Sequence, residues 1–327
     1  MILVRAPLRI TLGGGGTDLP SYFQNFGGLT VSAAIDKSIY LSLVRPFDNK
    51  IRLKYSSQEV CDTIDEIDHT IMREVLRSAG HSFKNGIEIS SQADVPSGTG
   101  LGSSGAFTVA LCHAVCEYKR QFISQIEAAE WACDIEINVL GRPVGKQDQY
   151  ISAVGGIQTL RYQQDESVDI QRLNLMDDTL GMLDDNLMMF FTGYSREAAS
   201  VLNHQDKMTK QSDDAMLEKM HDVKRNGEDT IKMLETGDLM SFAESLNEHW
   251  RKKRERSPGM SNANIDEMYA LGMANGALGG KLVGAGSGGF MLFYAHDKVA
   301  LRRSFSEKGY REMPFRFCFG GVETLTR

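Results

Sequence analysis

A glycine-rich stretch at residues 96–106, PSGTGLGSSGA, has the composition of a loop that binds phosphate. It follows a predicted strand and precedes a predicted amphipathic helix. Its glycines therefore allow backbone N–H groups to turn inward at the start of a helix. These N–H groups and the positive end of the helix dipole together favour a bound anion. The stretch predicts a site for the phosphates of a nucleotide.

Other interpretations of this stretch compete with phosphate binding. A Gly-x-Gly-x-x-Gly match that begins at Gly100 would indicate an NAD(P)-dependent oxidoreductase. That fingerprint requires a strand–helix–strand unit with an acid about 20 residues further on, and here one predicted helix runs into another. The P-loop pattern G-x-x-x-x-G-K-[ST] is absent, because the Gly-Lys pair at Gly280 is followed by leucine. A turn that only caps a helix, through Ser103 or Ser104, remains the structural alternative.

Three motifs occur in the order that is typical of the GHMP small-molecule kinases, such as galactokinase, homoserine kinase and mevalonate kinase. Residues 96–106 follow the P-x-x-x-G-L-G-S-S-[AG] pattern of that family throughout. APLRITLGGGGTDLPSY at 6–22 resembles its first, sugar-recognising motif, and GGKLVGAGSGGFMLF at 279–293 resembles its third. The resemblance spans nearly the whole chain.

The resemblance implies a two-domain α+β kinase that uses ATP and Mg²⁺. We expect a ribosomal-protein-like N-terminal domain at 1–180 and a ferredoxin-like C-terminal domain at 181–327. The residues expected to bind ATP are those of the central motif: Pro96, Ser97, Gly98, Thr99, Gly100, Leu101, Gly102, Ser103 and Ser104.

The same resemblance assigns metal and catalytic roles. Ser104 and Glu136 match the magnesium ligands of the family, and Mg²⁺ prefers hard oxygen ligands. Asp148, twelve residues after Glu136, matches the aspartate that lies against the sugar hydroxyl in galactokinase-like members, where it accepts the proton or orients the hydroxyl. Arg9, from the first motif, and Lys146, from its place beside Asp148, are expected to keep that carboxylate ionised and to stabilise charge on the transferred group.

Substrate contacts are expected from the first and third motifs and from the TGYSR turn. The predicted residues are Gly16, Thr17, Asp18, Arg196, Gly286 and Ser287. Asp18 matches the aspartate that accepts hydrogen bonds from sugar hydroxyls. A phosphate at the far end of the substrate would require cations, for which the candidates are Arg196, Lys253 and Arg254. The RKKRER run at 251–256 fits a solvated helix face equally well.

Within the family, the segments GGGGTD, FFTGYSR and EHWRKKRERSPGMSN most resemble the branch of heptose-phosphate and fucose kinases. Gly15 and Gly16 stand where galactokinase has a Glu-His pair, which counts against galactose. The branch implies phosphorylation of the anomeric hydroxyl of D-glycero-D-manno-heptose 7-phosphate to the 1,7-bisphosphate, for nucleotide-activated heptose and surface polysaccharide. An L-fucose kinase and a non-catalytic sensor of sugar and nucleotide stay open, although the presence of Glu136 and Asp148 counts against the sensor.

The elements that must position these residues are read from hydrophobic periodicity and turn signals. Strands are predicted at 2–12, 29–45, 86–91, 157–162, 187–193, 289–295 and 314–319. Helices are predicted at 63–79, 104–118, 124–140, 196–225, 228–235, 238–256, 262–276 and 297–308. Grouped strands and helices, rather than strict alternation, favour the α+β class.

Composition restricts the class of protein further. The chain has 327 residues and a net charge of −7, with 42% hydrophobic residues, which is ordinary for a soluble globular protein and unfavourable for non-specific nucleic-acid binding. No apolar run approaches the roughly 20 residues of a transmembrane helix, and MILVRAPLRI does not have the pattern of a secretory signal. Cys112 and Cys116 share a predicted helix face but lack a second pair of metal ligands, so core thiols are favoured over a metal site. We expect a reduced, cytoplasmic enzyme with a small-molecule substrate.

Overall fold

The computed structural model describes residues 1–80, 83, 85–193, 206–209, 213–256, 259–284 and 286–327. Within them the chain forms one eight-stranded and one three-stranded sheet, with helices packed on both. This mixture of largely antiparallel sheets and helices confirms the α+β prediction. In these ranges no helix is both long and apolar enough to span a membrane.

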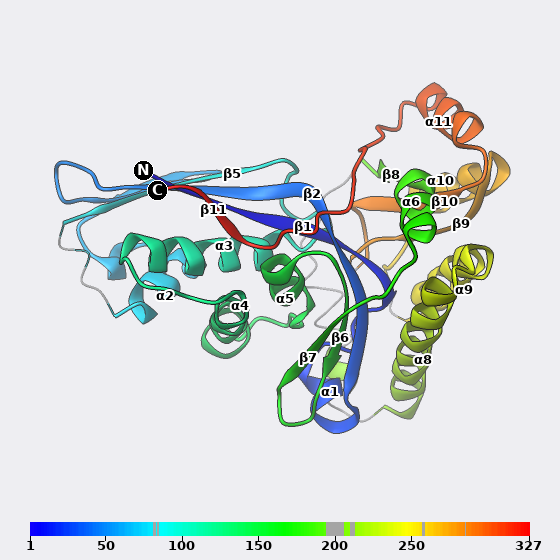
Figure 1. Ribbon diagram of the computed structural model, residues 1–327, viewed down its shortest axis with the longest axis horizontal. Coiled ribbons are helices and arrows are strands. Elements are labelled where there is room, and N and C mark those ends of the chain that lie inside the picture. The colour runs from blue at the N-terminus through cyan, green and yellow to red at the C-terminus, as the bar shows by residue number, and fades with distance from the viewer. Residues whose placement is uncertain (81–82, 84, 194–205, 210–212, 257–258, 285) are drawn as a thin grey trace.

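The larger sheet is built around two long strands near the start of the chain. Its members are β1 (Ile2–Gly14), β2 (Gly28–Val44), β3 (Ile51–Lys54), β4 (Gln58–Cys61), β5 (Ile87–Ala93), β6 (Ile157–Tyr162), β7 (Val168–Arg172) and β11 (Glu323–Thr326). The order β11-β1-β2-β5-β3-β4 is antiparallel except between β3 and β5. β2 pairs with β6 through its first half and with β5 through its second, so it runs through both arms of the sheet in Figure 1.

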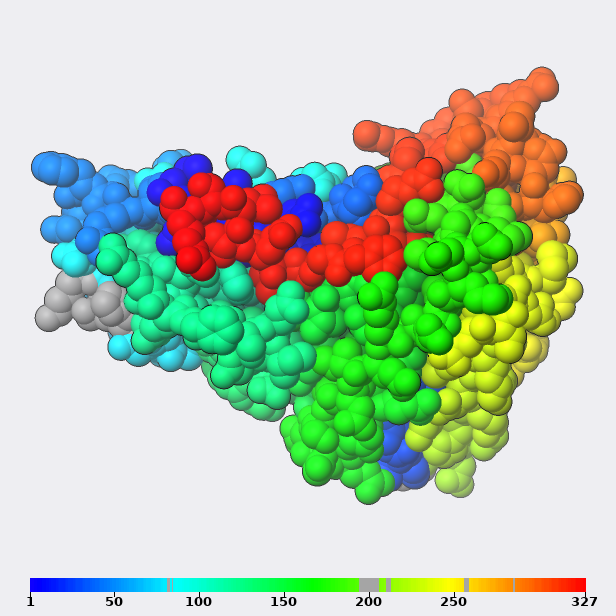
Figure 2. Space-filling view, in the orientation of Figure 1, coloured from blue at the N-terminus to red at the C-terminus, as the bar shows by residue number. Residues whose placement is uncertain are grey.

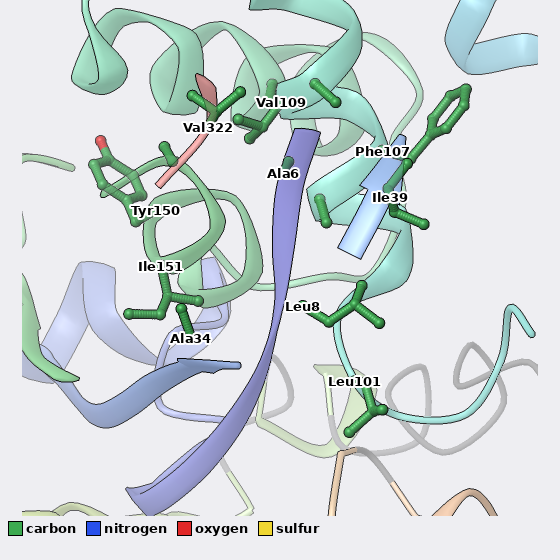
Figure 3. Packing of buried hydrophobic residues seen from close by; sticks show 14 of the residues in the cluster. Ala6, Leu8, Ala34, Ile39, Leu101, Phe107, Val109, Tyr150, Ile151 and Val322 are labelled. Carbon is green, nitrogen blue, oxygen red and sulfur yellow. The ribbon is translucent and has the colours of Figure 1, made fainter. Parts of the chain in front are cut away.

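Four helices cover one face of this sheet: α2 (Thr70–Ser78), α3 (Ser103–Tyr118), α4 (Gln125–Cys133) and α5 (Gln147–Val154). α3 is apolar on nearly all sides and is therefore buried between the sheet and its neighbouring helices. Figure 3 shows Ala6 and Leu8 of β1 among Val109 of α3 and Ile151 of α5. This packing fixes the starts of α3 and α5 relative to β1.

The smaller sheet has the antiparallel order β8-β10-β9, formed by β8 (Leu187–Phe191), β10 (Phe290–Ala295) and β9 (Ala277–Leu282). Its neighbouring helices are α6 (Asp177–Asn186), α9 (Leu239–Arg256), α10 (Ala263–Ala274) and α11 (Lys298–Glu307). Trp250, Phe190, Phe293 and Phe305 are buried in the core between them.

Two segments connect the halves of the chain. α8 (Asp214–Thr236) packs against α9 and β1, and the Thr230 side chain lies against Gly13. β11 pairs with β1 at the edge of the larger sheet, and Figure 2 shows this C-terminal segment lying beside the N-terminal strand. A short helix, α1 (Pro20–Phe26), follows β1. We retain 1–180 and 181–327 as a proposed division, with β11 as the part of the second half that joins the first sheet.

Several predicted elements differ from the structure. The single helix expected at 124–140 is α4 followed by a π-helix, η2 (Asp134–Val139). The helices predicted at 196–225 and 228–235 are not separate over the residues described, because residues 214–236 form the continuous α8. Much of 196–212 lies outside the described residues. The strand expected at 314–319 is not regular, and only a single bridge joins Phe317 to Ile35.

Candidate active site

A cavity of about 1160 Å³ lies where the glycine loop, the ends of β1 and β5, α9 and β9 converge. Most of the predicted loop residues line it, namely Pro96, Ser97, Gly98, Gly100, Gly102, Ser103 and Ser104. Two do not. Thr99 is fully buried and its hydroxyl donates to the carbonyl of Pro96, while Leu101 belongs to the hydrophobic core.

The glycine loop is held from two sides by contacts to its own backbone. Arg9 of β1 donates its backbone N–H to the carbonyl of Leu101 (3.0 Å) and its Nη1 to that of Gly100 (2.6 Å). On the other side, a Cβ added at Gly100, whose φ is +78°, would lie 2.8 Å from the carbonyl oxygen of Val283. Glycine is therefore required at position 100 by both its left-handed backbone and this close approach.

The N-terminus of α3 opens into the cavity without a capping side chain. Gly102 is the N-cap residue, and the alternative in which Ser103 or Ser104 caps the helix is not what the structure has. The N–H groups of the first turn have no acceptor within the helix, so they and the helix dipole suit a bound phosphate.

Asp148 lies in the first turn of α5, directly beside this loop. Arg9 donates Nε to Asp148 Oδ1 (2.7 Å), and its Nη2 lies 2.7 Å from the same oxygen. The Arg9 side chain is 7% exposed and that of Asp148 is 30% exposed. The pair therefore joins a buried cation to a carboxylate that remains accessible from the cavity.

A second carboxylate, Asp18, lies deeper in the same wall. Its Oδ1 accepts the N–H of Gly16 (2.9 Å) and its Oδ2 accepts the N–H of Gln147 (3.1 Å). Burial raises the pKa of Asp18, and the charge of Asp148 raises it further. Gln147 also bonds Thr11 through its side chain (2.9 Å), so it connects the first motif to the start of α5.

Glu136 is carried by the π-helix η2 and is fully buried. The Ser104 hydroxyl donates to Glu136 Oε2 (2.5 Å), and Thr108 and Gln149 donate to its Oε1 (3.1 and 2.9 Å). Burial raises the pKa of Glu136 above its usual range. The Arg142 guanidinium lies against the same group, 3.5 Å from Oε2.

The Ser104–Glu136 pair has the donor chemistry that Mg²⁺ prefers. Magnesium typically takes one or two carboxylate or hydroxyl oxygens from protein and the rest from substrate phosphates and water. A hydroxyl and a carboxylate at the start of α3, beside the anion-binding N–H groups, fit this requirement. Elsewhere in the described ranges no cluster of three or more acidic, histidine or cysteine side chains competes as a metal site.

We therefore expect Glu136→Gln to raise the Mg²⁺ concentration for half-maximal turnover by about 10- to 100-fold, because the amide is a weaker ligand than the carboxylate. The measurement is a Mg²⁺ titration of ADP release at saturating substrates. Glu130→Gln, an exposed change on the preceding helix α4, is the matched control. An unchanged magnesium requirement in Glu136→Gln would contradict the assignment.

Several predicted residues are not brought to the cavity. Lys146 donates its ammonium to the carbonyl of Glu166 (2.7 Å) and lies over the Phe23 ring (5.1 Å), so it does not assist Asp148 as expected. The Thr17 hydroxyl is fully buried and donates to the carbonyl of Leu29, which makes Thr17 a structural residue. Gly16 and Asp18 do line the cavity.

The third motif contributes scaffold rather than substrate contacts at Gly286 and Ser287. Ser287 is buried, its hydroxyl donates to the carbonyl of Gly259 (2.7 Å), and neither residue lines the cavity. Arg254 lies on the surface, 3.3 Å from Asp266. Lys253 does line the cavity, with its ammonium bound to backbone carbonyls, whereas Arg196 lies outside the described residues.

The structure adds residues that the motifs did not indicate. Tyr55, His69 and Phe107 form an aromatic group in the cavity wall. The ring centroids are 4.7 Å apart for Tyr55 and His69 and 5.3 Å apart for His69 and Phe107. Lys281 and His249 also line the cavity and are almost completely buried. A lysine inside the apolar and glycine-rich third motif is an available signal, because lysine is rarely buried without a reason.

Two protein-family models match this chain. The model of the GHMP kinases N terminal domain matches residues 68–156, and that of the GHMP kinases C terminal matches 230–311. The chain is 31% identical to the D-glycero-alpha-D-manno-heptose 7-phosphate kinase of Campylobacter jejuni, over 99% of this chain and 98% of that protein.

A more distant relative and a solved structure are also similar to this chain over most of its length. An L-fucokinase/L-fucose-1-P guanylyltransferase of Bacteroides fragilis is 23% identical over 91% of this chain but only 35% of its own length. The crystal structure of a D-glycero-D-manno-heptose 1-phosphate kinase from Bacteroides thetaiotaomicron superposes with a TM-score of 0.82 at 25% identity, covering 100% of this chain and 99% of the other.

Proposed function

Since the chain belongs to the GHMP kinase family and is an ATP-dependent phosphotransferase, we propose that its acceptor is the anomeric hydroxyl of D-glycero-D-manno-heptose 7-phosphate. The observation that carries this proposal is the meeting of Asp148, Arg9 and the glycine loop at one wall of the cavity. The full-length similarity to the Campylobacter heptose 7-phosphate kinase supports the choice of sugar.

Asp148 has the environment of a group that orients an acceptor hydroxyl. Its Oδ1 is bound to the Arg9 guanidinium, which leaves Oδ2 to accept a hydrogen bond from the hydroxyl. Because phosphoryl transfer proceeds through a loose transition state, orientation of the hydroxyl contributes even without full deprotonation. Asp18, which is held by its backbone hydrogen bonds, would accept from a second hydroxyl of the sugar.

The positive groups around the glycine loop would stabilise charge on the transferred phosphoryl group. The first-turn N–H groups of α3 and the Arg9 guanidinium are fixed in place before substrate binds, so little reorganisation is needed during transfer. Ser104 and Glu136 would hold Mg²⁺, which neutralises phosphate charge when bound. The aromatic group of Tyr55, His69 and Phe107 suits the flat face of a purine base.

A panel of acceptors tests the proposed substrate. We expect ADP release with ATP and Mg²⁺ to be strong with heptose 7-phosphate and weak with mannose 6-phosphate, fucose, mannose and galactose. Turnover with fucose instead would assign the chain to the fucose kinase branch. This branch is the second candidate because of the similarity to a more distant fucokinase relative. Absence of turnover across the panel, with ATP binding retained, would favour a sensor.

A further inference from the structure

The Arg142 guanidinium lies against both residues of the proposed magnesium pair, Ser104 and Glu136. Its Nη1 donates to Ser104 Oγ (3.2 Å) and lies 3.5 Å from Glu136 Oε2. Over the ranges that the structure describes, Arg142 is the only lysine, arginine or histidine that forms an ion pair with Glu136. The backbone N–H of Arg142 also donates to the carbonyl of Glu136 (2.9 Å), so its main chain is fixed at the end of the π-helix. Arg142 therefore binds the oxygens that we assign to Mg²⁺.

The Arg142 side chain is held at the cavity wall but is not enclosed. It is 35% exposed, against 1% for the side chain of Glu136, and Arg142 lines the cavity. Its Nη2 donates to Thr70 Oγ1 at the start of α2 (3.1 Å). Glu136, by contrast, is held from within the core by Thr108 and Gln149. Rotation of the Arg142 side chain can therefore separate the ion pair while Glu136 stays in place.

A metal ion and the Arg142 guanidinium would compete for the same carboxylate. A buried carboxylate is costly unless a cation or several hydrogen-bond donors face it, and Arg142 supplies the cation here. Mg²⁺ bound to the same oxygens would repel the guanidinium, because like charges a few ångströms apart interact strongly away from bulk water. The free energy needed to separate Arg142 from Glu136 therefore lowers the affinity for the metal.

Arg142 also lies between the metal pair and the aromatic group. Thr70, which accepts from Arg142, follows His69 of the aromatic group in the chain. Phe107 of the same group lies one helical turn after Ser104 on α3, and both line the cavity. A nucleotide with its base on the aromatic group and its phosphates at the start of α3 would pass beside Arg142. Phosphate oxygens are strong acceptors for a guanidinium that leaves a carboxylate.

We propose that Arg142 is an internal cation that exchanges with Mg²⁺. It neutralises Glu136 while no metal is bound, and it transfers to the nucleotide phosphates when Mg²⁺ takes the Ser104–Glu136 pair. This inference rests on the magnesium site proposed above. Its consequence is that Glu136 does not face an incoming polyphosphate without a counter-ion. The exchange also weakens the dependence of nucleotide binding on Mg²⁺, since a positive charge lies beside Glu136 both before and after the metal binds.

The test measures how strongly Mg²⁺ enhances nucleotide binding. The affinity for a non-hydrolysable ATP analogue is measured by calorimetry in excess EDTA and in excess Mg²⁺, and the ratio of the two association constants is compared between variants. Arg142→Met should raise this ratio by about 10-fold, as for loss of a charge-assisted hydrogen bond that solvent partly screens. The rise comes from weaker binding of the metal-free analogue, because Glu136 then faces the phosphates without its cation.

Two further variants separate this effect from a general one. Arg142→Lys keeps the charge and should return the ratio to within a few-fold of the unaltered enzyme. Arg73→Met is the matched control, because Arg73 is also a partly exposed arginine beside a largely buried glutamate, Glu74, but does not line the cavity. It should leave the ratio unchanged. A ratio that is unchanged or lower in Arg142→Met would overturn the proposal.

A stability measurement without nucleotide tests the ion pair itself. In EDTA, Arg142→Met should lower the Tm by about 2–6 °C, because Glu136 keeps a buried charge and loses its cation. In the Glu136→Gln background the same substitution should lower the Tm by less than about 1 °C, since no charge is left to neutralise. Equal losses in both backgrounds would show that Arg142 acts through packing, which contradicts its role as a counter-ion.

The outcomes also distinguish the role of Arg142 from the magnesium site. If Glu136→Gln abolishes the enhancement by Mg²⁺ and Arg142→Met leaves it unchanged, the magnesium site stands and the exchange is wrong. If Glu136→Gln leaves the enhancement as it is in the unaltered enzyme, the magnesium site itself is wrong. Neither result depends on which sugar is the acceptor, because the assay contains none.

Discussion

Asp148→Asn is expected to lower kcat on the order of 1,000-fold while the affinity for ATP changes by no more than a few-fold. An amide cannot accept the hydroxyl proton and weakly orients the nucleophile, and positioned acid–base groups typically contribute 10²–10⁴-fold. The glycine loop is held by Arg9 through the carbonyl of Gly100 and the backbone of Leu101, contacts that do not involve Asp148. Nucleotide binding should therefore survive the substitution.

The measurement pairs steady-state ADP release with calorimetric titration of a non-hydrolysable ATP analogue. Asp177→Asn is the matched control, because Asp177 also lies in the first turn of a helix but is exposed and does not line the cavity. Turnover within a few-fold of the unaltered enzyme in Asp148→Asn would remove Asp148 from the catalytic role.

Gly105→Ala should disable the enzyme although it replaces no functional side chain. A Cβ at position 105 would lie 2.6 Å from Asp148 Cβ and 3.0 Å from the backbone nitrogen of Gln149, so α3 and α5 must separate. Displacement of a catalytic group by about 1 Å can cost 100-fold, and we expect a fall in kcat of about that size. Overpacking of the same contact should also reduce the free energy of unfolding by about 1–3 kcal/mol.

Gly181→Ala is the control for this effect. Gly181 lies within helix α6, and an added Cβ there meets no atom within 4 Å. Alanine should stabilise that helix by about 0.5–1 kcal/mol and leave kcat unchanged. Activity and denaturant unfolding measured on both variants decide the matter. A Gly105→Ala enzyme with full kcat would show that the α3–α5 contact does not position Asp148.

Two elements agree closely with their sequence-based predictions. The strand at 157–162 has the predicted bounds, and helix α3 differs from its prediction by one residue. Short elements such as β3, β4 and β11 were missed, because their stability comes from pairing with β5 or β1 rather than from their own few residues. The π-helix was also missed, since one extra residue in a turn leaves no periodic signal.

For the candidate site, the motifs predicted most of the glycine-loop residues that line the cavity. They failed for residues whose side-chain direction decides whether they reach the cavity. Lys146 is two residues from Asp148, but at the start of α5 its side chain leaves toward Glu166. Thr17 and Asp18 are neighbours, yet only Asp18 lines the cavity. Lys281 is more than 200 residues from Leu12, so only the folded chain reveals that its ammonium donates to the Leu12 carbonyl and lies beside His249.

The π-helix at Asp134–Val139 carries Glu136, so the direction of this side chain depends on the number of residues that precede it in the helix. A helix advances about 100° per residue, so deletion of one residue from α4 would turn the side chain of Glu136 by about that angle around the helix axis. Glu136 would then turn away from Ser104 and Thr108 although each of these residues is still encoded. At the magnesium site that we propose, the number of residues between Ser124 and Glu136 would therefore matter as much as the presence of the glutamate itself.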